Sequence, residues 1–177
     1  MKIGVLVVAG ACLIPALGRA QTAAEVQAAQ ANMMQNERHM VLAMIDSMPS
    51  QYFRDKATPA QRDFAMQLYH AVSAVPFLAR TAMGSTVPAF GGMRDSTSAT
   101  ASKDALRAFT NAAYDWAGQA VGAQTPAQRL AAVSLFGAHM TAWQVWDEIH
   151  QHTMWTLGQT VANFRAHGMA PPAFMFF

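Results

Sequence analysis

The spacing of apolar residues limits what this chain can fold into. No segment alternates apolar and polar residues with the period of two that a half-buried strand requires, so no sheet is predicted. In residues 21–48, Met40 and Met44 instead belong to a set of apolar residues that recurs with the period of a helix. Thr22 and Glu25, three residues apart, have the sequence of a capping box. A long first helix is therefore predicted here.

Further helices are predicted from start and stop signals. Three long segments are expected: 58–83, with Thr58 as N-cap, Pro59 in the first turn and a kink at Pro76; 102–122; and 141–167, which ends before Gly168 and Pro171-Pro172. Residues 84–99 are rich in Gly, Ser, Thr and Pro and predict a long loop, and residues 125–128 predict a short helix or turn. Four long helices in one small domain predict an all-α fold, a four-helix bundle.

Residues 1–20 differ from the rest of the chain. The run from residue 3 to residue 17 is almost continuously apolar, and Gly18 and Ala20 place small residues before a cleavage site. This pattern is typical of a secretory signal peptide, since the apolar run is too short for a membrane span; a retained anchor is the alternative. We therefore expect the domain 21–177 to be exported, to the periplasm or beyond, with no stable membrane span after cleavage.

Removal of this segment changes the charge and the cysteine count. Without Lys2 and Arg19 the 12 basic residues become 10, which balance the 10 acidic residues. A neutral domain without a Lys/Arg cluster lacks the electrostatic footprint of a nucleic-acid-binding protein. Cys12, the only cysteine, lies in the removed segment. The domain therefore has neither a disulfide nor a thiolate nucleophile, and its core must hold it together.

Two stretches resemble the DinB-like family of four-helix bundles. Residues 46–78, "DSMPSQYFRDKATPAQRDFAMQLYHAVSAVPFL", carry in the family's order a Met-Pro, an aromatic pair, a Thr-Pro helix start, an Arg and a His: Met48-Pro49, Tyr52-Phe53, Thr58-Pro59, Arg62 and His70. Residues 147–172, "DEIHQHTMWTLGQTVANFRAHGMAPP", match at Gly158-Gln159, Arg165, Gly168 and Pro171-Pro172. The resemblance spans nearly the whole expected domain and implies a bundle of the DinB-like type.

The resemblance also implies a divalent metal site. In the family, a His of the second helix and a His-x-x-x-His pair of the fourth bind the metal, and the matching positions here are His70, His152 and Thr156. Two of the three ligands are present, and a threonine replaces the third. Glu148 lies four residues before His152 on the same helix face, so it is a candidate substitute ligand. Such a set would suit zinc, nickel, iron or manganese, with a ligand water held at Thr156.

Three functions remain open at this point. Some family members look like thiol S-transferases, so one hypothesis is a metal-dependent hydrolase or transferase acting on an unknown small molecule. The alternative is a non-catalytic bundle that has lost its metal, in which His70 and His152 are interior residues, and that binds a small apolar ligand or a protein partner. The third is a copper(I) site in which the methionine stripe Met40, Met44 and Met48 acts together with a His, although methionines at helical spacing usually fill a core.

The sequence also predicts where other histidines, Gln159 and the C-terminal tail should lie. His150 lies about 200° around the helix from His152, so we expect it to be exposed. His139 precedes the last helix and could reach the site, and Gln159 could either hydrogen-bond a ligand or brace a neighbouring helix. The apolar tail 173–177, "AFMFF", is expected to dock on the bundle or to pair with a second subunit, which would give a homodimer.

Overall fold

The computed structural model describes residues 21–173, most of which are helical. The helices and strands are α1 (Ala23–Ser47), α2 (Phe64–Met83), α3 (Ser96–Ala99), α4 (Lys103–Ala123), α5 (Pro126–Leu130), β1 (Ala132–Leu135), β2 (Ala138–Thr141) and α6 (Ala142–Ala166). Two short 3₁₀ turns, η1 (Ser50–Tyr52) and η2 (Gly84–Thr86), follow α1 and α2. The signal peptide expected at residues 1–20 lies outside the described residues.

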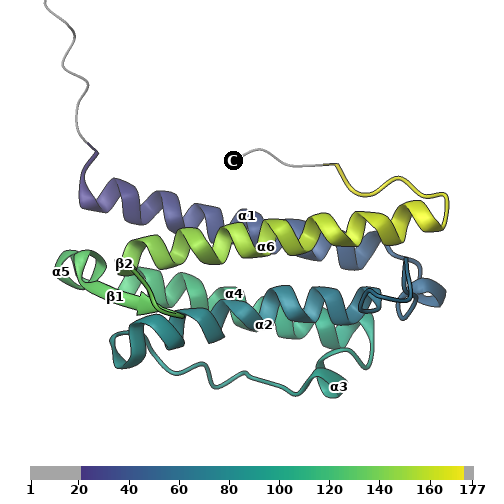
Figure 1. The fold of residues 1–177 in the computed structure, drawn as a ribbon, viewed down its shortest axis with the longest axis horizontal. Coiled ribbons are helices and arrows are strands. Elements are labelled where there is room, and N and C mark those ends of the chain that lie inside the picture. The colour runs from purple at the N-terminus through teal and green to yellow at the C-terminus, as the bar shows by residue number, and fades with distance from the viewer. Residues whose placement is uncertain (1–20, 174–177) are drawn as a thin grey trace, which may run out of the picture.

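The four long helices lie side by side (Figure 1). In that view α1 and α6 form one layer above α2 and α4, while α5 and the strands lie at one end and α3 lies on the loop below. Helix α1 packs mainly against α4, and α2 packs mainly against α6. The expected predominance of helices is therefore confirmed.

The core between these helices is built from the apolar positions that the helical period singled out. Met40 and Met44 on α1 and Met48, which caps its C-terminus, are all buried, as core packing requires. Trp146 on α6 and Tyr114 on α4 are among the largest fully buried side chains. Burial of such side chains stabilises a fold by roughly 1.5–3 kcal/mol each, so the core can hold the helices together without a disulfide.

Most of the predicted helix ends are confirmed. Thr22 and Glu25 form the reciprocal hydrogen bonds of a capping box at the start of α1. Thr141 starts α6 with a capping box of its own. Gly168 follows α6 with a φ of +69°, a left-handed conformation that glycine adopts without a steric penalty.

The predicted start of the second helix is wrong. Thr58 begins a turn, in which its carbonyl accepts a hydrogen bond from the Gln61 backbone N–H at 3.1 Å. Helix α2 begins at Phe64, and the carboxylate of its N-cap, Asp63, accepts a hydrogen bond from the Met66 N–H at 2.8 Å. The Phe64 N–H donates to the Asp55 carbonyl at 3.0 Å. The preceding loop thus satisfies the first N–H groups of the helix, which moves its start beyond the Thr-Pro signal.

The expectation of no sheet is also wrong, because β1 and β2 form an antiparallel hairpin before α6. Leu135 pairs with Ala138, so Phe136 and Gly137 are the two turn residues. Their φ angles are +50° and +88°, as in the type I′ turns that favour Asn-Gly. A phenylalanine at the first turn position removes the usual sequence signal. Strands of four residues are also too short to establish a period of two.

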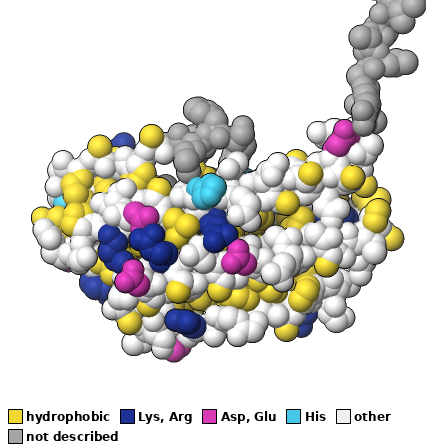
Figure 2. All heavy atoms as spheres, turned by 180° about the vertical axis from the view of Figure 1, so that it is seen from behind, with side chains coloured by type: hydrophobic (Ala, Val, Ile, Leu, Met, Phe, Trp, Pro, Cys, Tyr) yellow, Lys and Arg dark blue, Asp and Glu magenta, His cyan; other side chains and the backbone are white. Residues whose placement is uncertain are grey.

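The surface carries interspersed charges. On the face seen in Figure 2, basic and acidic side chains lie next to one another rather than in separate fields. Two ion pairs, Arg38–Asp115 and Arg107–Asp46, link α1 to α4. Within residues 21–173, no helix is both long enough and apolar enough to cross a membrane.

The start of α2 provides a stability test. Asp63→Ala removes the N-cap and should lower the free energy of unfolding by about 0.5–2 kcal/mol, measured by urea denaturation. Asp63→Asn keeps a capping side chain but loses the ion pair with Arg54, so it separates the two contributions. Thr58→Ala should change little, and a larger loss for Thr58→Ala than for Asp63→Ala would contradict the observed helix start.

Candidate functional site

The structure brings His70 and His152 together across the contact between α2 and α6. Their ring centroids lie 5.1 Å apart, and the ring planes are inclined by 70°. Both side chains are half-buried. The Nδ1 atom of His152 is itself buried and has no hydrogen-bond partner. The two residues that the sequence placed in one site are therefore neighbours, and one of them has an unused nitrogen.

Burial and a nearby cation lower the pKa of both imidazoles and so favour their neutral form. Desolvation is the largest cause that lowers the pKa of His70, followed by the positive charge of Arg62 and by His152. The pKa of His152 is lowered by desolvation first and by Arg62 second. Neutral imidazole is the form that binds a metal, so both rings are available as ligands at lower pH than a free histidine would be.

The structure does not bring the expected third ligand to this pair. Glu148 is exposed on α6. Among residues 21–173 no group of three His, Cys, Asp or Glu side chains is arranged to hold a metal ion. Thr156 is buried at 1% exposure, so its hydroxyl lies in the interior of the protein.

The seam between α2 and α6 is fixed on the far side of Thr156 by polar and aromatic contacts. The Gln67 amide donates to the Gln159 side-chain oxygen at 2.9 Å. Further along, Phe64 and Phe164 meet edge to face with centroids 5.7 Å apart. Of the two roles considered for Gln159, the structure supports the brace. These contacts hold the backbones that carry the two histidines.

His150 is not exposed as expected. Its Nδ1 lies 2.6 Å from Oε1 of Glu37, a fully buried carboxyl group on α1. Tyr114 on α4 donates its hydroxyl to the other carboxyl oxygen at 3.1 Å. His150 and His152 both turn inward because α6 has neighbours on two sides, α1 on one and α2 on the other. The three-helix cluster Glu37–Tyr114–His150 was missed from the sequence.

A signal for this cluster does exist in α1. Glu37 lies three residues after Met34 and four before Val41, both fully buried, so it occupies a position in the apolar stripe. A carboxyl group at such a position needs partners. Burial is the largest effect on Glu37 and raises its pKa, while the hydrogen bond and charge of His150 and the hydroxyl of Tyr114 oppose that rise.

The other candidates lie apart from the histidine pair. His139 is exposed on β2. Met40 and Met44 line an apolar pocket between α1 and α6 whose walls include Met154 but no histidine. The mixed methionine and histidine ligands of the copper(I) hypothesis are thus not combined in this pocket.

Glu37 makes the stability of the protein depend on pH. The pKa of Glu37 in the folded state lies above the ordinary value of 4.5. The contribution of Glu37 to the free energy of unfolding is therefore complete below pH 4.5 and is lost as the pH rises through the folded-state pKa. Urea denaturation of the parent and of Glu37→Gln between pH 4 and 8 measures this. The stability of the parent relative to the variant should fall as the pH rises, and a constant difference would contradict the raised pKa.

Comparison with known proteins gives no independent identification. No protein-family model matches the chain, and no curated protein matches it significantly.

Proposed function

We propose that the chain is a DinB-like four-helix bundle that binds one divalent transition metal at His70 and His152. The order of the sequence motifs and the four long helices packed side by side support the family. The observation that carries the proposal is the buried Nδ1 of His152, which has no hydrogen-bond partner and belongs to a ring that lies against that of His70. A buried polar atom without a partner costs free energy, and a metal ion would satisfy it.

The available donors fit a metal held by two imidazoles rather than by three side chains. His70 and His152 would hold it, since desolvation and Arg62 keep both rings in the neutral form. Thr156 is too weak a donor to replace the family's third ligand, and the exposed Glu148 does not join the pair. The remaining positions would be left to solvent or substrate, an arrangement typical of catalytic rather than structural sites.

A divalent metal at such a site supplies a Lewis acid that lowers the pKa of a bound water or thiol. This chemistry supports a hydrolase or a thiol transferase. The protein's own residues would hold and orient the metal through the two rings, and the Gln67–Gln159 brace fixes the helices that carry them. The positive charge of Arg62 opposes the binding of a cation but attracts an anionic group, so a substrate with an acidic group suits the site.

The apolar run at residues 1–20 supports export to the periplasm or beyond, where a domain without cysteine needs no disulfide chemistry.

The second candidate function is a non-catalytic bundle that binds an apolar molecule. The pocket between α1 and α6, lined by Met40, Leu157 and other apolar residues, is the specific observation that favours it.

Metal content tests the first candidate. The domain beginning at Gln21, purified without a histidine tag, should hold about one equivalent of zinc, nickel, iron or manganese, measured by mass spectrometry of the metals. His70→Ala and His152→Ala should each abolish this binding because each removes one of only two protein ligands.

His39→Ala is the matched control, since His39 is an exposed histidine on α1 away from the pair. Its metal content should equal that of the parent. Absence of metal from the parent even after incubation with each ion would reject the metal site and favour the non-catalytic candidate.

Restoring the family's third ligand provides a separate test. Thr156→His should tighten zinc binding by at least about tenfold, since loss of even an outer partner of a ligand commonly costs 10–100-fold. Thr160→His places the same side chain one turn further along α6, at another buried threonine. Competition with a zinc-sensitive dye measures both affinities, and equal affinities in the two variants would argue against a site at position 156.

A further inference from the structure

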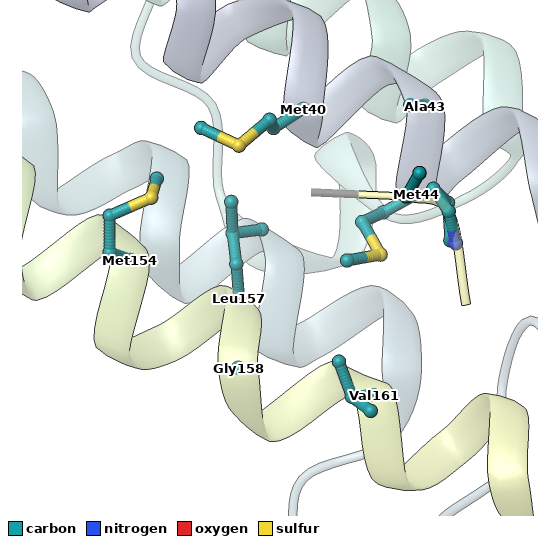
Figure 3. Close-up of a pocket in the computed structure, with 9 residues that line it drawn as sticks. Met40, Ala43, Met44, Met154, Leu157, Gly158 and Val161 are labelled. Atoms are coloured by element: carbon teal, nitrogen blue, oxygen red, sulfur yellow. The ribbon is translucent and has the colours of Figure 1, made fainter. Parts of the chain in front are cut away.

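An apolar pocket lies between α1 and α6, away from the histidine pair. Figure 3 shows Met40 and Met44 of α1 and Met154, Leu157 and Val161 of α6 pointing into the space between the two helices. All nine residues that line it are apolar or glycine. The free energy of the protein falls when an apolar group covers such a surface and removes it from water.

The volume of the pocket fits one aromatic ring. It measures about 170 Å³, and engineered apolar cavities of about 150 Å³ bind benzene. Methionine side chains make favourable contacts with the edges of aromatic rings, and three of them line this space. The chemistry of the walls therefore matches a phenyl group.

Gly158 leaves part of the pocket open. A Cβ atom built at this position meets no atom within 4 Å, so close packing of helices does not require a glycine here. A glycine inside a helix costs roughly 0.5–1 kcal/mol relative to alanine. The open space above Gly158 belongs to the pocket that it lines.

The chain returns to this pocket after α6. Gly168 reverses its direction, and the Met169 N–H closes the helix end with a hydrogen bond to the Phe164 carbonyl at 2.9 Å. The segment then runs back along α6 (Figure 1), and Pro172 and Ala173 form the third wall of the pocket. The described chain thus ends at the pocket rim.

The four residues beyond Ala173 are Phe-Met-Phe-Phe. Four extended residues span about 13 Å, and the pocket floor from Met154 to Val161 covers about 10 Å of helix. The tail is therefore long enough to cross the whole pocket, and it carries three phenyl rings.

We propose that this pocket is the docking site of the chain's own C-terminal tail, residues 174–177, and that a phenyl ring of the tail fills it. The tail then acts as a strap that ties the end of α6 back onto α1. A second copy of the chain could offer the same rings, but the tail already starts at the rim of its own pocket. The proposal does not depend on metal binding at His70 and His152.

A double-mutant cycle tests the strap. A chain that stops after Ala173 should unfold at a lower urea concentration than the full chain. Gly158→Leu places a side chain in the pocket, so the same truncation should then cause less than half of that loss. Gly122→Leu is the matched control: Gly122 is also exposed, helical and free of atoms within 4 Å of an added Cβ, so the full loss should remain. Equal losses in all three backgrounds would overturn the proposal.

Toluene binding, followed through the methyl NMR signals of Met40, Met44 and Met154, provides a second readout that does not depend on the Gly158→Leu variant folding. The truncated chain should bind toluene at least tenfold more tightly than the full chain, and Phe174→Ala and Phe176→Ala identify the ring responsible. Equal toluene affinity in the full and truncated chains would overturn the proposal. A dimer of the full chain that truncation dissociates would also overturn it and assign the tail to a second copy.

Discussion

The packing of α6 against α2 is the contact on which the candidate site depends. The Phe64–Phe164 contact and the Gln67–Gln159 hydrogen bond fix the relative position of the two helices, and that position sets the distance between His70 and His152. Neither histidine needs a hydrogen bond from the other to reach this arrangement. The fold therefore sets the position of the pair, and the proposed metal site would require such a preorganised arrangement.

The opposite side of α6 buries a different kind of polar group. Glu37 at 0% exposure joins α1 to His150 of α6 and to Tyr114 of α4. Burial of a carboxyl group is costly, and its hydrogen bonds offset that cost only when all three helices are correctly aligned. The cluster therefore adds less to stability than an apolar core would, but it penalises any shift of α6 along α1.

The sequence predicted the long helices but not what lies between them. Local signals suffice where a cap acts on its own helix, as Thr22 and Thr141 do. They fail where the partner is distant in the chain: carbonyls of the preceding loop, such as that of Asp55, set the start of α2, and no local signal marks the hairpin at Phe136. For the site, helical geometry separates His150 from His152 correctly. It cannot tell that α6 has a partner on both sides, which is why His150 was expected in solvent.

Helix α6 thus carries two chemically distinct faces within two turns. Gln159 lies on a polar face toward α2, where it accepts a hydrogen bond from Gln67, whereas Leu157 and Gly158 line the apolar pocket toward α1. Residues that are adjacent in the sequence therefore belong to separate sites. A change at position 159 alters the hydrogen bond that braces α6 against α2, and a change at position 158 alters the methionine-lined pocket. Because the backbone between them is one continuous helix, the proposed strap at the end of α6 would also restrain the face that carries His152.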